Sequence, residues 1–157
     1  MKFFNQNAIS SIVAQTRQAP AGFRFAFVPH ILNEEFYNKL ADSFPDTRGF
    51  VLTDKMSGGG RKRFFVGPRY AAGRHYGCVC DLHKLNPVWH DFLREAASPE
   101  FINLLSEASG IRFNSLCGFG LMYGNEGCMQ EAHIDGAARA DDPNEIRSTF
   151  AGILYFN

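Results

Sequence analysis

Apolar residues recur at helical spacing in three segments of the first two-thirds of the chain. The first segment repeats a large apolar side chain at every fourth position, and these residues are Phe36, Leu40 and Phe44. Such spacing places the apolar side chains on one face of a helix. Asn33 precedes the segment as a capping residue, and Pro45 ends it because proline cannot continue a helix. The pattern therefore predicts an amphipathic helix between these two residues.

Two further helices are predicted by the pairs Asn86-Pro87 and Ser98-Pro99. Asn and Ser side chains accept hydrogen bonds from the first helical turn, and proline fits the first helical position. Gly110 ends the second of these helices, because glycine readily adopts the left-handed conformation that follows a helix. The residues expected to face inward are Val88, Trp89, Phe92, Leu93 and Ala96 in one helix, and Phe101, Leu104, Leu105 and Ala108 in the other.

Strand-like segments flank and follow these helices. Residues 23–28 and 63–66 are rich in phenylalanine, and the second stretch follows a glycine-rich turn. Beyond Gly110 the apolar and alternating segments are 111–123, 129–134 and 148–156. Helices first and strands later, without regular alternation, are typical of an α+β fold with an antiparallel sheet. No segment has the composition of a linker, so we expect one domain over residues 1–157.

Composition narrows the classes of protein that the chain can represent. Its 157 residues are 45% hydrophobic and 20% charged, which is typical of one globular domain. Sixteen Lys and Arg balance sixteen Asp and Glu, and a net charge of zero argues against binding to nucleic acid or to an anionic membrane. No apolar run approaches the roughly 20 residues of a membrane span, and the N-terminal stretch is too polar for a signal peptide. Four cysteines do not form a dense disulfide framework in a domain of this size, so we expect a protein of the reducing cytoplasm.

The most informative stretch for chemistry is His133-Ile134-Asp135. In a strand, residues separated by one position point to the same face, about 7 Å apart along the backbone. An imidazole and a carboxylate that converge on one point suit a divalent first-row metal, and they are two members of a 2-His-1-carboxylate triad. The same pair also occurs as a hydrogen-bonded His–Asp couple or as two unrelated surface residues.

Three motifs stand in a fixed order along the second half of the chain: Leu121-Met122-Tyr123-Gly124, then His133-Ile134-Asp135, then residues 152–157. In this order they resemble the iron(II)/2-oxoglutarate-dependent dioxygenases, in particular the prolyl 4-hydroxylase-like branch. The phenylalanine-rich strand and the helices upstream are similar too, so the resemblance covers nearly the whole chain. It implies a double-stranded β-helix, or jelly-roll, oxygenase fold with N-terminal helices packed on an antiparallel sheet.

The resemblance implies a role for each matching residue. His133 and Asp135 correspond to iron ligands, and Tyr123 corresponds to a residue that hydrogen-bonds a carboxylate of 2-oxoglutarate; a core tyrosine on a barrel strand is the alternative. A carboxylate at Asp135 favours hydroxylation, because related halogenases have a small residue there. The implied cofactors are Fe(II), 2-oxoglutarate as cosubstrate and O₂. The implied reaction hydroxylates a C–H bond of an unidentified small-molecule or peptide substrate and forms succinate and CO₂.

The chain departs from the family pattern after Asp135. The family places a second iron-binding histidine and a basic residue for 2-oxoglutarate further along, whereas no histidine follows Asp135, and Arg139 and Arg147 come too early. We therefore expect a barrel that is incomplete at the C-terminus and inactive by itself, with self-association through its open last strand. The alternative is a truncated or degenerate oxygenase fold that acts as a non-catalytic binding or interaction module.

Other histidines and cysteines offer further candidate ligands. Cys78, Cys80 and His83 form a conceivable half of a zinc site, but no second pair has zinc-ligand spacing, and buried thiols on a strand are the favoured interpretation. The upstream histidines, which we expect to be surface or hydrogen-bonded residues and not a third iron ligand, are His30, His75, His83 and His90.

Overall fold

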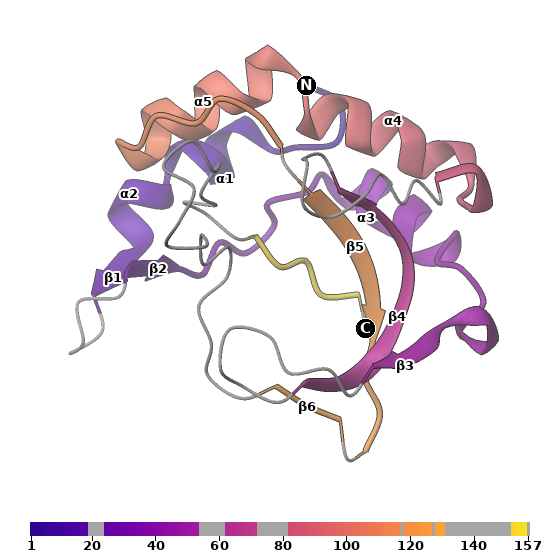
Figure 1. The fold of residues 1–157 in the computed structure, drawn as a ribbon. Helices are drawn as coiled ribbons and strands as arrows, with labels where there is room; N and C mark the ends of the chain where they lie inside the picture. Colours follow the sequence, from indigo (N-terminus) through magenta and orange to yellow (C-terminus); the bar gives the residue numbers. More distant parts are fainter. Residues whose placement is uncertain are drawn as a thin grey trace, which may run out of the picture. The chain divides into compact units, whose positions relative to one another are not determined.

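The structure is a computed structural model, and it describes residues 1–18, 24–53, 62–71, 82–116, 118–126, 128–130 and 152–156. The chain forms two compact units: unit 1 is Met1–Phe44 with Asn86–Leu116, and unit 2 is Pro45–Leu85 with Cys117–Asn157. Figure 1 labels their helices and strands. Unit 1 is mainly helical and unit 2 contains an antiparallel sheet, so the α+β class is confirmed. One domain over 1–157 stays a prediction, and a chain that passes between the two units three times is compatible with it.

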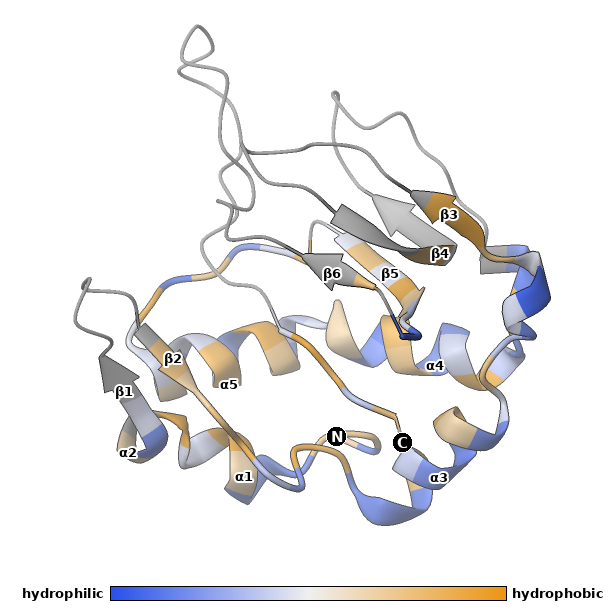
Figure 2. Ribbon diagram, turned by 90° about the horizontal axis from the view of Figure 1, so that it is seen from below, coloured by the Kyte–Doolittle hydropathy of each residue, from blue (hydrophilic) through white to orange (hydrophobic). Residues whose placement is uncertain are grey.

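Unit 1 consists of helices and one short pair of strands. Its elements are α1 (Gln6–Ser10), α2 (Ile12–Gln15), β1 (Thr16–Gln18), β2 (Arg24–Ala26), α3 (Glu34–Asp42), α4 (Pro87–Ala96) and α5 (Pro99–Ser109). β1 and β2 pair antiparallel, α1 and α2 pack against α5, and α4 packs against both α3 and α5. Figure 2 shows hydrophobic and hydrophilic residues interspersed along α4 and α5, as expected of helices that bury one face. None of the described helices is long and apolar enough to cross a membrane.

The predicted ends of α4 and α5 are confirmed by their capping hydrogen bonds. The Asn86 side chain accepts a hydrogen bond from the backbone N–H of Val88 (3.0 Å), and the Ser98 side chain accepts one from the N–H of Phe101 (3.2 Å). Gly110 follows α5 with a φ of 69°, the left-handed conformation that glycine adopts without steric cost. Local sequence signals therefore suffice to place these two helices.

The buried faces of α4 and α5 agree with the prediction except at their edges. The predicted residues that are buried are Trp89, Phe92, Leu93, Ala96, Leu105 and Ala108. Ile102 is buried as well, whereas Phe101, Leu104 and Val88 are half-buried. Phe101 lies at the edge of the core, where its ring stacks on that of Phe4 with centroids 4.0 Å apart. Because Ile102 is buried and Phe101 and Leu104 are not, the buried face of α5 is rotated from the predicted one.

Aromatic rings form the core of unit 1. Phe92 contacts the rings of three residues at centroid distances of 5.7, 5.4 and 6.0 Å, and these residues are Phe3, Phe4 and Trp89. Trp89 is fully buried, and its indole N–H donates a hydrogen bond to the carbonyl of Ser43 (3.1 Å). The one polar atom of the largest core side chain is thus satisfied.

A carboxylate on α4 holds the first residues of the chain against these rings. Glu95 accepts hydrogen bonds from three consecutive backbone N–H groups at 2.7, 2.8 and 3.1 Å, and the donors are Lys2, Phe3 and Phe4. We call this arrangement the Glu95 clamp. Charge-assisted hydrogen bonds of this kind are stronger than neutral ones. Because the clamp joins residues more than 90 positions apart, it fixes the start of the chain to α4.

Asn33 supports the same segment from the other side, which corrects its predicted role. It precedes α3 as expected, but its side chain makes no capping hydrogen bond. Its Nδ2 donates to the carbonyl of Lys2 (2.7 Å), and its backbone N–H donates to the carbonyl of Phe3 (2.8 Å). The predicted side-chain cap at Asn33 is therefore wrong, because the amide hydrogen-bonds a distant backbone group instead.

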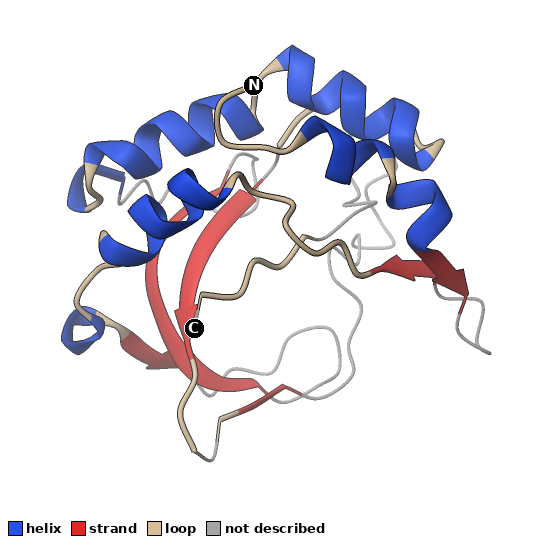
Figure 3. Cartoon of the chain, turned by 180° about the vertical axis from the view of Figure 1, so that it is seen from behind, coloured by secondary structure: helices blue, strands red, loops and turns tan. Residues whose placement is uncertain are grey.

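Unit 2 contains a sheet built around one long strand. Its elements are η1 (Thr47–Gly49), β3 (Val51–Thr53), β4 (Lys62–Ala71), η2 (Leu82–Lys84), β5 (Gly118–Tyr123) and β6 (Met129–Gln130). The strand order is β3–β4–β5, β6 also pairs with β4, and every pair is antiparallel. Figure 3 shows β4 and β5 as two curved strands side by side. β4 continues five residues beyond the end of the predicted segment 63–66, so this strand of the sheet is longer than expected.

A bulge interrupts β4 at Gly67 and Pro68. The β4–β5 register shifts between Val66 and Arg69, so β4 uses three steps where β5 uses two. Proline has no N–H for a strand ladder and is tolerated at such a bulge. The buried ring of Phe50 fills the space beside Gly67, where a Cβ atom would lie 2.6 Å from Phe50 Cε1. Only glycine leaves room for this ring.

Three predicted strands differ from the structure. Residues 111–116 have no strand, because the N–H of Phe113 donates to the hydroxyl of Ser106 (3.0 Å) and not to a neighbouring strand. Within 148–156 the described residues 152–156 contain no strand, and of 129–134 only β6 is described. The packing of the helices on the sheet and closure into a double-stranded β-helix stay predictions.

The Glu95 clamp predicts a large contribution to stability from one side chain. Glu95→Ala leaves three backbone N–H groups without their acceptor, so we expect the free energy of unfolding to fall by about 2–4 kcal/mol. Glu95→Gln keeps one acceptor oxygen and should lose less. Urea unfolding measures both. Glu107→Ala, at an exposed position of α5, is the control and should change the value by less than about 0.5 kcal/mol. Equal effects at positions 95 and 107 would contradict the clamp.

The bulge predicts that Gly67→Ala is destabilising through one specific contact. The new methyl group overlaps the Phe50 ring, so we expect a loss of about 1–3 kcal/mol in urea unfolding. Phe50→Leu removes the overlapping ring atoms, and Gly67→Ala should cost at least about 1 kcal/mol less in that background. Gly49→Ala is the matched control, because nothing lies within 4 Å of a Cβ there. Additive effects at positions 50 and 67 would show that the overlap is relieved elsewhere.

Candidate functional site

Tyr123 is the residue of the predicted site that the structure describes. It ends β5, as predicted, and pairs across the strands with Phe65 of β4, with ring centroids 5.9 Å apart. Leu121, two positions earlier and therefore on the same face, is buried, whereas Tyr123 is 39% exposed. Its hydroxyl makes no hydrogen bond within the described part of the chain. Tyr123 therefore combines a ring that contacts the sheet with a partly exposed side chain, whose hydroxyl the described residues leave unused.

A compact turn follows Tyr123, and two residues close it. The backbone N–H of Cys128 donates to the carbonyl of Asn125 (3.0 Å), and the Cys128 thiol donates to Asn125 Oδ1 (3.2 Å). In return, the N–H of Asn125 donates to Cys128 Sγ (3.2 Å). Sequence reasoning assigned no role to either residue. The usual turn preference of asparagine was the signal available, whereas the thiol gave none.

The turn keeps the chain on the same partner strand. Tyr123 pairs with Phe65, and Met129, the first residue of β6, pairs with Arg63. Between these two pairs the chain has five residues on the side of β5 and β6 and one residue, Phe64, on β4. β5 and β6 both run antiparallel to β4 along successive stretches of it. Of the predicted strand 129–134, in which the His-x-Asp motif begins, β6 is described as far as Gln130.

His133 and Asp135 lie outside the described residues. The preceding described residue is Gln130, the end of β6, three positions before His133. Their convergence on one face of a strand therefore stays a prediction. Arg139 and Arg147 also lie outside the described residues.

The upstream histidines occupy separate elements. His90 lies on α4 of unit 1 and His83 on η2 of unit 2. His30 is exposed in the turn after β2, with a φ of 55°. Where the chain is described, no group of three or more His, Cys, Asp and Glu side chains could hold a metal ion. The remaining candidate ligands named from the sequence fall outside those residues, and they are His75, Cys78 and Cys80.

Comparison with known proteins finds no relative: no family model, no curated protein and no solved structure matches the sequence.

Proposed function

We propose that the chain forms part of a non-haem iron(II)/2-oxoglutarate-dependent dioxygenase site. His133 and Asp135 hold the iron, and Tyr123 hydrogen-bonds a carboxylate of 2-oxoglutarate. The observation that carries the proposal is the element formed by β5, the closed turn and β6. It stands directly before the His-x-Asp motif, in the same order as in the family that the sequence resembles.

The surroundings of Tyr123 suit contact with an anionic cosubstrate. A phenol O–H donates a strong hydrogen bond to a carboxylate. The cross-strand contact with Phe65 restrains the ring, so the hydroxyl is held in place by the sheet. Because the residue is partly exposed and its hydroxyl makes no hydrogen bond with the described residues, contact with a ligand breaks none of the described hydrogen bonds.

The chemistry of His133 and Asp135 fits a divalent iron. A neutral imidazole and a carboxylate are two of the three ligands of the facial triad typical of Fe(II) oxygenases. With 2-oxoglutarate and O₂, such an iron supplies the oxidation of a substrate C–H bond to C–OH, with succinate and CO₂ as products. The protein's own part is to position these groups and to keep water from them.

Metal binding tests the role of His133. We expect residues 1–157 to bind Fe(II), Co(II) or Mn(II) weakly, because two protein ligands leave most coordination positions to water. His133→Ala should lower the affinity about tenfold or more, measured by anaerobic calorimetry. His90→Ala, on α4, is the control and should leave it unchanged. Tight binding that survives His133→Ala contradicts the assignment and would direct attention to Cys78, Cys80 and His83.

Binding of 2-oxoglutarate tests the role of Tyr123. With Mn(II) present, Tyr123→Phe should weaken 2-oxoglutarate binding about tenfold, because it removes one charge-assisted hydrogen bond. The ring and its contact with Phe65 remain, so the free energy of unfolding should change by less than about 0.5 kcal/mol. Tyr155→Phe is the matched control, since Tyr155 is another exposed tyrosine of unit 2. Metal-independent binding, or the same loss in both variants, would contradict the proposal.

A further inference from the structure

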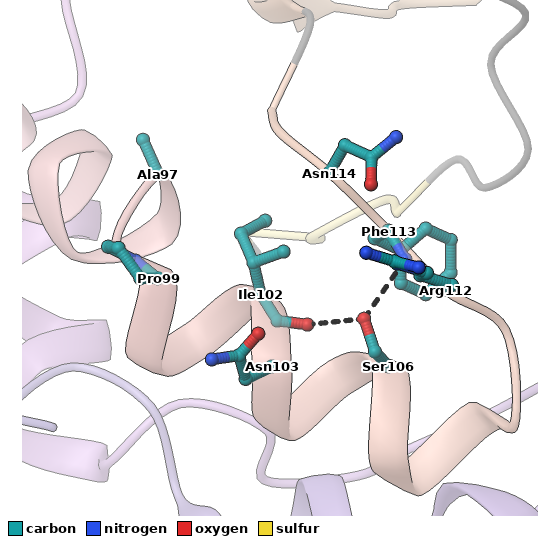
Figure 4. Close-up of a pocket in the computed structure, with 8 residues that line it drawn as sticks. All are labelled: Ala97, Pro99, Ile102, Asn103, Ser106, Arg112, Phe113 and Asn114. Atoms are coloured by element: carbon teal, nitrogen blue, oxygen red, sulfur yellow. Dashed lines mark hydrogen bonds between the residues drawn. The ribbon is translucent and has the colours of Figure 1, made fainter.

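Unit 1 contains a cavity that the proposed oxygenase site does not use. It has a volume of about 330 Å³ and opens between α5 and the segment that follows Gly110 (Figure 4). Ligand sites in proteins begin at about this size. The lining residues that matter here are Ile102, Asn103 and Ser106 of α5 and Arg112, Phe113 and Asn114 of the returning segment. We call this space the α5 cavity.

The walls of the α5 cavity are fixed by hydrogen bonds. Gly110 ends α5 in the left-handed conformation and lets the chain turn back along the helix. The backbone N–H of Phe113 then donates to the Ser106 hydroxyl (3.0 Å), and that hydroxyl donates to the carbonyl of Ile102 (2.7 Å). Ser106 therefore serves as a structural link and leaves ligand contacts to its neighbours. A returning segment tied to the helix in this way forms a site that exists before a ligand arrives.

The lining of the α5 cavity combines charged, polar and apolar side chains. In Figure 4 the guanidinium of Arg112 and the side-chain amide of Asn114 lie on one side of Ile102, and the amide of Asn103 lies on the other. Arg112 is the one charged residue of the cavity lining, and within the described residues it forms no ion pair. The apolar part of the lining comes from Ala97, Pro99, Ile102 and Phe113. The cavity thus offers one positive charge, two amides and an apolar wall.

We propose that the α5 cavity binds a small organic monocarboxylate with an apolar body of about the size of benzoate. A guanidinium binds a carboxylate through two parallel hydrogen bonds, and an amide of the lining donates a further one. The apolar part of the lining, from Ala97, Pro99, Ile102 and Phe113, covers the carbon body of the ligand. Because a single cation lines the cavity, one negative charge is balanced, whereas phosphate or a dicarboxylate leaves a second charge unpaired.

Titration of the chain with benzoate, followed by backbone amide NMR, tests the proposal. We expect shifts confined to residues 99–114 and a dissociation constant on the order of 1 mM, as befits so small a ligand. Benzamide, the neutral analogue, should bind at least about tenfold more weakly, and so should acetate, which lacks the apolar body. Equal binding of benzoate and benzamide, or of benzoate and acetate, overturns the proposal, as does the absence of benzoate binding.

Substitutions locate the charge that the ligand meets. Arg112→Ala should weaken benzoate binding about tenfold or more, and Arg112→Lys should restore part of it, because lysine keeps the charge but not the two-pronged geometry. Arg94→Ala removes an exposed arginine of α4 that pairs with Asp91 (2.8 Å), and it should leave binding unchanged. Equal loss in the alanine variants at 94 and 112 would show a general effect of charge and overturn the site. The comparison of benzoate with benzamide needs no variant, so it decides the question even if Arg112→Ala fails to fold.

Discussion

Unit 1 depends on the Glu95 clamp. The first residues of the chain have no helix or sheet of their own to satisfy their backbone N–H groups, and Glu95 accepts hydrogen bonds from three of them. Asn33 satisfies the carbonyls of the same segment from the opposite side. With both edges of the backbone bonded, Phe3 and Phe4 can be buried without leaving polar groups unpaired. The aromatic core is therefore held together in part by hydrogen bonds that join residues 2–4 to Asn33 and Glu95, which are distant in the sequence.

The helices could be predicted from the sequence because their signals are local. A cap, a proline and a periodic apolar face lie within a dozen residues, and the starts of α4 and α5 follow directly from them. The Glu95 clamp could not be predicted, since its partners are more than 90 positions apart. The same reason explains the error at Asn33. A residue with the right chemistry for a cap was used for a contact that no local pattern indicates.

In the sheet and the candidate site, too, some features could be predicted from the sequence and others could not. The end of β5 at Tyr123 was visible in the sequence, whereas the length of β4 was not, because a bulge at Gly67 and Pro68 lets the strand continue through a proline. The closure of the turn by the Cys128 thiol has no sequence signature. The α5 cavity exists because Ser106 links the returning segment to α5. The sequence could not predict it, because its apolar pattern indicates a strand over residues 111–123.

The burial of Trp89 has a consequence for how the folding of this chain can be followed. It is the sole tryptophan of the sequence, it belongs to unit 1, and its indole is fully enclosed. Tryptophan fluorescence therefore reports the opening of unit 1 alone, whereas far-ultraviolet circular dichroism sums the backbone of both units. Coincident melting curves from the two signals would mark a single cooperative transition. Separate midpoints would instead reveal that the helical and the sheet-bearing halves lose their structure independently.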